Sequence, residues 1–312
     1  MVRVRACALN HLDLSQRRGL DRVTIPMPHI SGADVAGEIA SVGAGIDDCR
    51  PGDRVMLQPG ISCGHCRACL AGQDHRCPFY DVLGYRSAGG YAELVSVPLV
   101  NVIPLPDHVD FITAAAFPLT FLTAWHMLVS LARVTETDVV LVVAAGSGVG
   151  QAAIQIAKYH GARVIATAGG AGKLAQARQL GADLTVDHYR DDVVAEVKSF
   201  SSGHGADIVI DHAGVATWER SLRSLARGGR LVTCGATTGY DARVDLRHLF
   251  AKQLQLLGSY MGSKPELLRA SALFFRGVFR PVIDRTWRLS EAAQAHRYLE
   301  SSSQFGKVVL EI

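Results

Sequence analysis

The sequence predicts an α/β protein in which a β-rich N-terminal domain is followed by a doubly wound parallel sheet. From about residue 119, apolar runs alternate with amphipathic segments, which is the rhythm of parallel strands joined by crossover helices. Before that point the chain is rich in glycine, proline and short alternating runs, typical of strands joined by turns. The 312 residues suffice for two domains, because single cores rarely grow beyond about 250–300 residues.

The first domain is expected over residues 1–118. VRVRA alternates apolar and charged residues, as a strand with one buried face does. DVAGEIASVGAGIDDCRPGDRVML predicts two strands joined by glycine turns, and YAELVSVP predicts a further strand. Few helices are expected in this domain.

The second domain is expected over residues 119–261. DVVLVVAAG is a continuous apolar run, typical of a parallel strand buried on both faces. VGQAAIQIAKYHG predicts a helix that ends at Gly161. Further strands are predicted at ARVIATA, ADLTVDH, ADIVIDHAG, RLVTCGA and LQLLGSYMG. Helices are predicted at KLAQARQLG, DDVVAEVKSF and ATWERSLRSLARGG.

The last segment, residues 262–312, carries two predicted helices and two strands, ending in GKVVLEI. This is too little to form a domain of its own. We expect it to return to the N-terminal domain and pack there.

The composition is that of an ordinary globular protein, with a net charge of +3 that is too small to indicate nucleic acid or an anionic membrane as partner. No apolar signal segment follows Met1, so a cytoplasmic location is expected. Residues 111–132 and 139–157 lack Lys, Arg, Asp and Glu, but Pro118 or several glycines interrupt them. They predict core helix and buried strand, and no membrane span.

A glycine-rich loop follows the first strand of the second domain: Ala144-Ala145-Gly146-Ser147-Gly148-Val149-Gly150. Small residues let the backbone approach a pyrophosphate, and the helix that follows offers free N–H groups at its start. A tight turn without ligand would give the same pattern, but the surrounding strands and helices favour a dinucleotide site. The predicted cofactor-binding residues are Ala145, Gly146, Ser147, Gly148, Val149 and Gly150.

The end of the next strand favours NADPH over NADH. NAD sites usually carry an acid there for the ribose hydroxyls, whereas Ala166-Thr167-Ala168-Gly169-Gly170 carries none. Lys173 follows, and Tyr189 with Arg190 comes after the third strand. We expect Lys173 and Tyr189 to bind the 2′-phosphate, although Lys173 and Arg190 could also be ordinary solvated charges.

Four of the seven cysteines crowd together as Cys63, Cys66, Cys69 and Cys77. This spacing suits one tetrahedral zinc, and four thiolates close its shell, so the predicted site is structural. Reduced thiols without metal and an iron–sulfur cluster are the alternatives.

Three motifs occur in one chain and in order: GADVAGEIASVGAGIDDCRPGDRV, CGHCRACLAGQDHRC and AAGSGVG. Together they resemble the zinc-binding alcohol dehydrogenases of the medium-chain dehydrogenase/reductase superfamily. ALNHLDL, PLTFLTAW and ATAGGAGK resemble its quinone oxidoreductase branch more closely. The resemblance implies a GroES-like catalytic domain, a Rossmann domain, a nicotinamide cofactor, a small-molecule substrate and a homodimer or homotetramer.

The resemblance also locates a catalytic zinc that this chain is expected to lack. The family's three ligand positions fall on Asn10, Ala33 and, approximately, Leu119. None of these side chains replaces a thiolate or an imidazole. His11 and His29 lie nearby in the sequence but do not rebuild a ligand set.

By the same resemblance, the Asn10 amide is the predicted donor to a developing oxyanion, and the Thr123 hydroxyl is predicted to position the nicotinamide. Tyr85 is expected to be structural, and no general acid is assigned. The predicted nicotinamide pocket comprises Cys234, Gly235, Ala236, Ser259 and Met261. The expected activity is NADPH-dependent hydride transfer to a quinone or to an activated C=C or carbonyl group.

Two departures from the family pattern stand out. Ser147 replaces the usual middle glycine of the nucleotide loop, and family members usually carry further strands before VRVRA. The second departure predicts an unpaired strand edge or reflects an incomplete gene model. Two other functions stay open: a zinc-dependent alcohol dehydrogenase with other ligands, and a non-enzymatic, NADPH-linked nucleic-acid-binding module. The lack of a basic stripe with interleaved aromatics argues against the latter.

Overall fold

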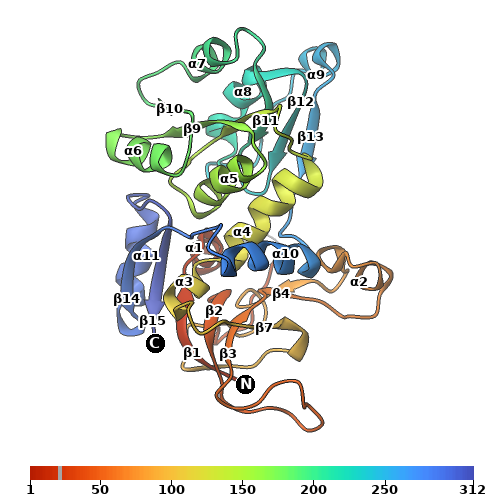
Figure 1. Ribbon diagram of the computed structural model, residues 1–312, viewed down its shortest axis with the longest axis vertical. Coiled ribbons are helices and arrows are strands. Elements are labelled where there is room, and N and C mark those ends of the chain that lie inside the picture. Colours follow the sequence, from red (N-terminus) through yellow and green to blue (C-terminus); the bar gives the residue numbers. More distant parts are fainter. Residues whose placement is uncertain (20–22) are drawn as a thin grey trace. The chain divides into compact units, whose positions relative to one another are not determined.

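The computed structural model describes residues 1–19 and 23–312, which form two compact units (Figure 1). One unit comprises residues 1–122 and 262–312, and the other comprises residues 123–261. The division between them falls inside helix α4 (Pro118–Trp125).

The first unit is built on a seven-stranded sheet with the order β14-β15-β1-β2-β3-β7, and β6 pairs with β1. Its strands are β1 (Val2–Ala8), β2 (Asp34–Ile39), β3 (Arg54–Leu57), β6 (Leu94–Val95), β7 (Val102–Pro104), β14 (Ile283–Arg288) and β15 (Lys307–Glu311). In β1 the valines are buried and the arginines exposed, as the alternation predicts. β1 is paired with β2 on one side and with β6 and β15 on the other, so it is not an edge strand.

Helices α10 (Lys264–Phe275) and α11 (Ala292–Glu300) complete this unit at the C-terminal end of the chain. The loop that carries the four clustered cysteines lies between the short strands β4 (Gly60–Ile61) and β5 (Asp81–Val82) and contains α2 (Arg67–Leu70). Helix α3 (Phe111–Ala115) precedes α4.

Helix α1 (His11–Arg18) lies where strands and turns were expected. Asn10 caps it, and Asp13 closes a capping box by accepting a hydrogen bond from the Asn10 backbone N–H at 2.8 Å. Both polar side chains are buried, so the periodicity of apolar residues does not reveal this helix.

The second unit is a six-stranded parallel sheet with the order β10-β9-β8-β11-β12-β13. Its strands are β8 (Val139–Val142), β9 (Arg163–Ala168), β10 (Leu184–Asp187), β11 (Ala206–Ile210), β12 (Leu225–Thr233) and β13 (Gln255–Gly258). Its helices are α5 (Gly148–Tyr159), α6 (Ala171–Gln179), α7 (Val193–Phe200), α8 (Val215–Ser224) and α9 (Leu246–Lys252). The doubly wound sheet predicted from the sequence is confirmed, with a core of buried side chains from β8, β9 and β11.

The strand order reverses between β8 and β11. From β8 the chain builds outward to β9 and β10, then returns to β11 and builds the other way. Ligands of such sheets bind at the carboxyl ends of the strands beside this reversal.

Two predicted boundaries differ from the structure. LARGG was expected to end a helix, but α8 stops at Ser224 and these residues begin β12. Gly228 has a positive φ of 75°, and the β11–β12 register shifts there, so the strand accommodates an irregularity that disfavours helix. YAELVSVP pairs only at Leu94–Val95. Among the described residues, no helix combines the length and apolar character that crossing a bilayer requires, as predicted for residues 111–132 and 139–157.

Candidate functional site

The four clustered cysteines bring their sulfur atoms together, each within 4.8 Å of the others. The Sγ atoms of Cys63 and Cys69 are 3.9 Å apart, and those of Cys66 and Cys69 are 3.5 Å apart. Thiolates held about 2.3 Å from a tetrahedral zinc lie about 3.8 Å from one another. The donor set and its spacing therefore fit one zinc ion with no ligand position left open.

Backbone N–H groups and burial act in opposite directions on the sulfur atoms of this cluster. A backbone hydrogen bond from His65 lowers the pKa of Cys63 to about 6, whereas burial raises the pKa of Cys77 to about 11. The backbone N–H groups of Cys63 and Phe79 both point at Cys77 Sγ, at 3.5 and 3.4 Å. A bound cation would stabilise all four sulfur atoms as thiolates at neutral pH.

The nucleotide loop has the backbone geometry that a pyrophosphate requires. Ala144 has a left-handed φ of 54°, and a Cβ on Gly150 would lie 2.4 Å from the Ala144 carbonyl oxygen. Ser147 caps α5, and its hydroxyl accepts a hydrogen bond from Gly150 N–H at 2.8 Å. The start of α5 thus presents small residues and backbone donors at the carboxyl end of β8.

The ends of β9 and β10 carry the residues predicted to select the cofactor. Tyr189 lies against Gly169, where an added Cβ would meet the Tyr189 ring at 2.3 Å, and its side chain is otherwise exposed. Burial lowers the pKa of His188; the charge of Arg220 lowers it further, Asp187 raises it, and Lys173 lowers it to a smaller extent. Lys173 and Arg220 thus contribute positive charge at this end of the sheet, which Asp187 opposes.

Sequence reasoning missed an acid at the same place. Asp187, at the end of β10, accepts a hydrogen bond from Gly170 N–H at 3.3 Å and lies 4.0 Å from Arg190. It also accepts from Tyr189 N–H at 3.1 Å. The signal was present in VDHYRDD, but only the strand pairing of β9 with β10 brings this carboxylate beside Gly170.

The residues predicted for the nicotinamide end follow β12 and β13, which are adjacent and parallel. Cys234, Gly235 and Ala236 follow β12, and Ser259 N–H bonds Thr233 carbonyl at 2.8 Å. Burial, aided by Asp211, raises the pKa of Cys234 to about 12, so this thiol stays neutral. The further residues predicted here are Met261, which is buried with a φ of 55°, and Thr123, which is buried at the start of this unit.

In the first unit, Asn10 belongs to a buried polar cluster with Asp34 and Lys307. Lys307 Nζ donates to Asn10 Oδ1 at 2.7 Å and to Asp34 Oδ2 at 2.9 Å. Asn10 Nδ2 donates to the same Asp34 oxygen at 2.9 Å. The side chains of Lys307 and Asp34 are only 2% and 0% exposed, so this is a buried ion pair.

This cluster lies where the family resemblance places a catalytic zinc. Asp34 Oδ1 accepts from Leu119 N–H at 2.7 Å, and its other oxygen is taken by Asn10 and Lys307. The Lys307 ammonium thus already neutralises the Asp34 carboxylate, which follows Ala33 in the chain. A second cation does not fit this set of donors.

The cluster also occupies most of the hydrogen-bonding groups of Asn10, which was expected to donate to an oxyanion. Its carbonyl oxygen is engaged by Lys307 and one amide proton by Asp34, so a single amide proton remains, with Ala8 carbonyl 3.5 Å away. Sequence reasoning missed Lys307, which is 297 positions from Asn10. The available signal was a lysine within the otherwise apolar strand GKVVLEI.

Asp13 anchors α1 beneath this cluster. Its carboxylate accepts from Asn10 N–H and from the Tyr91 hydroxyl, both at 2.8 Å. Burial raises the pKa of Asp13 to about 6. The Tyr85 carbonyl accepts a hydrogen bond from the Gln16 amide at 3.0 Å, and His29 Nε2 lies 2.9 Å from the Gly84 carbonyl oxygen.

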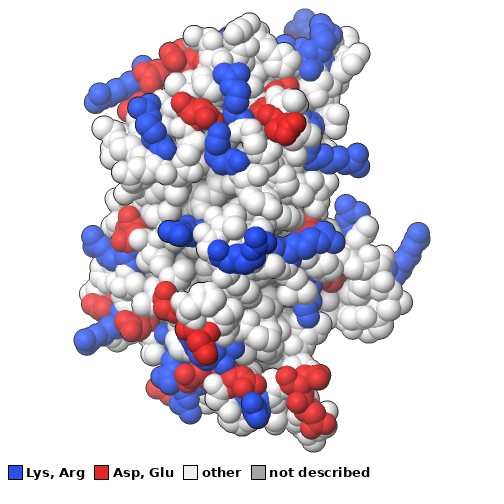
Figure 2. All heavy atoms as spheres, in the orientation of Figure 1, with Lys and Arg blue, Asp and Glu red and all other residues white. Residues whose placement is uncertain are grey.

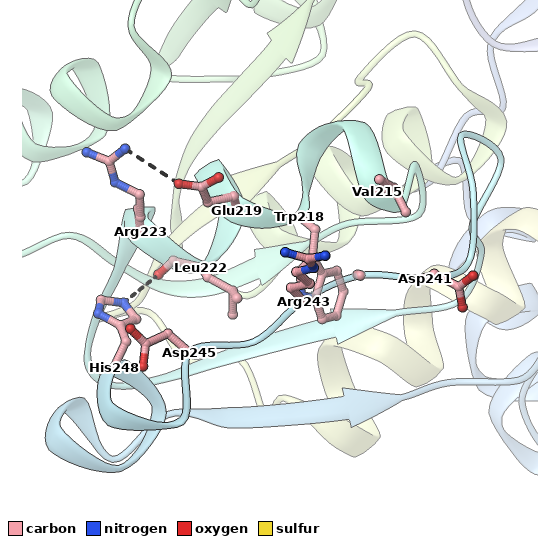
Figure 3. A pocket seen from close by; sticks show the side chains of 10 residues that line it. Val215, Trp218, Glu219, Leu222, Arg223, Asp241, Arg243, Asp245 and His248 are labelled. Carbon is pink, nitrogen blue, oxygen red and sulfur yellow. Dashed lines mark hydrogen bonds and ion pairs between the residues drawn. The ribbon is translucent and has the colours of Figure 1, made fainter.

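A hollow of about 660 Å³ lies elsewhere in the second unit, between α8 and the segment that leads into α9 (Figure 3). Among its lining side chains, Arg223 and Glu219 lie 4.0 Å apart, and His248 Nε2 lies 3.4 Å from the Leu222 carbonyl oxygen. None of the predicted cofactor residues lines it. On the face drawn in Figure 2, basic and acidic side chains are interspersed.

Known families match both units. Residues 1–107 match the alcohol dehydrogenase GroES-like domain, and residues 148–276 match the zinc-binding dehydrogenase family. The quinone oxidoreductase of Rattus norvegicus is 29% identical over 99% of this chain and 88% of its own.

Solved structures extend the similarity. The crystal structure of an NAD-dependent alcohol dehydrogenase is 47% identical, with a TM-score of 0.97 over 100% of this chain and 91% of its own. The 2-octenoyl-CoA carboxylase reductase CinF, solved with NADP and 2-octenoyl-CoA, is 30% identical, with a TM-score of 0.88 over 99% and 78% of the two chains. The chain belongs to the medium-chain dehydrogenase/reductase superfamily. It is an oxidoreductase of the quinone oxidoreductase and alcohol dehydrogenase type.

Proposed function

We propose that this protein is an NADPH-dependent reductase that delivers hydride to a quinone or to an activated C=C or carbonyl group. It holds one structural zinc and no catalytic metal. The observation that carries the proposal is the buried Lys307–Asp34 pair with Asn10. Alcohol oxidation benefits from a Lewis acid that acidifies the hydroxyl, and this cluster offers no ligands for one.

The zinc proposal rests on the cysteine cluster. Cys63, Cys66, Cys69 and Cys77 would hold the ion with all four positions filled. Such an ion stabilises the loop between β4 and β5 and takes no part in the reaction.

The cofactor proposal rests on the second unit. NADPH, when bound, supplies the hydride. The loop at Ser147 and Gly150 binds its pyrophosphate, and Lys173 with Tyr189 binds its 2′-phosphate. Thr123, Cys234 and the residues predicted with them position the nicotinamide. The second Asn10 amide proton, which makes only a long 3.5 Å contact with the Ala8 carbonyl, is the donor assigned to the oxygen that gains negative charge.

A second candidate is an NAD-dependent alcohol dehydrogenase. Two observations favour it: the 47% identity to a structure of that name, and the Asp187 carboxylate beside Gly170. A carboxylate at this place can accept from ribose hydroxyls and repel a phosphate.

Cofactor titration and turnover separate the two candidates. Lys173→Ala should weaken NADPH binding about tenfold, or ~1.4 kcal/mol, and change NADH binding less than twofold. Arg178→Ala is the matched control, because Arg178 lies on the same helix and bonds Thr185. Wild-type protein should oxidise NADPH with benzoquinone or an enone. Reduction of NAD by alcohols, with no quinone or enone turnover, would contradict the proposal.

A further inference from the structure

Ser147 and His212 form a hydrogen-bonded pair at the point where the strand order of the parallel sheet reverses. Ser147 Oγ and His212 Nε2 are 2.9 Å apart. Ser147 belongs to the loop after β8, and His212 follows β11, the strand paired with β8. The pair therefore lies at the carboxyl edge where such sheets bind their ligands.

The position of His212 is fixed from both sides. The backbone of the β11 end is held by a 3.0 Å bond from Val143 N–H to Ile210 carbonyl and another from Asp211 N–H to Val232 carbonyl. Gly235 packs beside the His212 backbone: an added Cβ would lie 3.1 Å from the His212 carbonyl oxygen and 3.6 Å from His212 Cβ. His212 thus stands between the pyrophosphate loop and the predicted nicotinamide residues after β12.

The direction of the single Ser147 hydroxyl proton decides whether this pair can donate a hydrogen bond to an anion. A hydroxyl has one proton and two lone pairs. Gly150 N–H already uses one lone pair, at 2.8 Å. If His212 donates from Nε2 to the second lone pair, the Ser147 proton points out of the loop. If His212 instead accepts that proton, the hydroxyl has no donor left for an anion.

We propose that His212 is a cofactor-positioning residue, whose Nε2–H donates to Ser147 Oγ and so directs the Ser147 hydroxyl proton to a pyrophosphate oxygen of the dinucleotide. The inference rests on the dinucleotide binding proposed above. Burial lowers the pKa of His212, so the ring is neutral at pH 7 and an anion beside Ser147 selects the donating tautomer. The serine hydroxyl thereby supplies a donor where a glycine would offer only close approach of the backbone.

The test is the dissociation constant of NADPH and of NADH for four variants, measured by titration of the full-length protein. His212→Leu should weaken both cofactors about three- to tenfold. His212→Gln, whose amide can donate from a similar position, should stay within twofold of wild type. In a Ser147→Gly background, His212→Leu should change the constants less than twofold, because the hydroxyl it directs is gone.

His160→Leu is the matched control, since this half-buried histidine caps the opposite end of α5 and burial lowers its pKa too. It should leave cofactor binding within twofold of wild type. Unchanged or tighter binding by His212→Leu would overturn the inference, because it would mean that His212 accepts the serine proton. So would an equal loss in the Ser147→Gly background. The pyrophosphate is common to both cofactors, so a preference of the wild type for NADH would overturn the proposed cofactor and leave this test unaffected.

Discussion

Replacing Lys307 by methionine should destabilise the first unit, because the Asp34 carboxylate would stay buried without its cation. Lys307 donates to Asp34 at 2.9 Å and to Asn10 at 2.7 Å, and both ends of the ion pair are almost completely buried. Removing one partner of such a pair costs about 3–5 kcal/mol in the free energy of unfolding. Replacing both charges at once costs much less, since no buried charge remains.

The double variant Asp34→Asn with Lys307→Met is therefore expected to recover most of the loss. The asparagine still offers an oxygen to Leu119 N–H, which Asp34 accepts at 2.7 Å. An exposed pair on the same sheet gives the control: Arg5 and Glu38 are also 2.9 Å apart, with side chains 45% and 30% exposed. Arg5→Met should cost about 1 kcal/mol or less.

Urea unfolding followed by circular dichroism measures these differences. At a slope of about 2–3 kcal/mol/M, Lys307→Met should lower the urea midpoint of the first unit by about 1–2.5 M. A shift no larger than that of Arg5→Met, or a double variant as unstable as the single one, would refute the reasoning.

Three further outcomes are expected. Cys77→Ser should abolish zinc binding and lower the thermal midpoint, whereas Cys49→Ser, outside the cluster, should retain the metal; this is checked by metal analysis and calorimetry. Gly150→Ala should abolish cofactor binding or folding, because the added Cβ would lie 2.4 Å from a backbone oxygen. Gly172→Ala is the control, because Gly172 lies in α6 with open space around it; urea unfolding should show it to be neutral or stabilising by about 0.5–1 kcal/mol. Burial raises the folded-state pKa of Asp13 to about 6 from 3.8, so the folded state holds this proton more tightly. The contribution of Asp13 to the free energy of unfolding should thus fall by about 3 kcal/mol as pH rises from about 4 to about 6. Urea unfolding of wild type and Asp13→Asn from about pH 4 to 7 should show this fall as a pH-dependent difference in stability between the two proteins.

The sequence predicted the parts of the fold that depend on local pattern. Apolar runs such as DVVLVVAAG located the parallel strands, because those strands are buried on both faces. Helix α1 escaped prediction because its buried residues include Asp13 and Gln16, whose polarity hides the helical period. The start of β12 was misassigned because LARGG follows an amphipathic helix without a break in composition.

The candidate site divides in the same way. The cysteine cluster and the nucleotide loop are local in the sequence, so spacing alone predicted them. The contacts of Lys307 with Asn10, and of His212 with Ser147, join residues 297 and 65 positions apart. Such pairs depend on which strands become neighbours, and a single sequence does not reveal strand order.

The central proposal is an oxidoreductase that holds one structural zinc and no catalytic metal. The most direct test is the zinc content of the folded protein after exhaustive dialysis, measured by mass spectrometry. We predict one zinc per chain, released when the four-cysteine cluster is disrupted by Cys77→Ser. Two zinc ions per chain, with one retained in that variant, would contradict the claim and show that the region around Asn10 and Asp34 binds a metal after all.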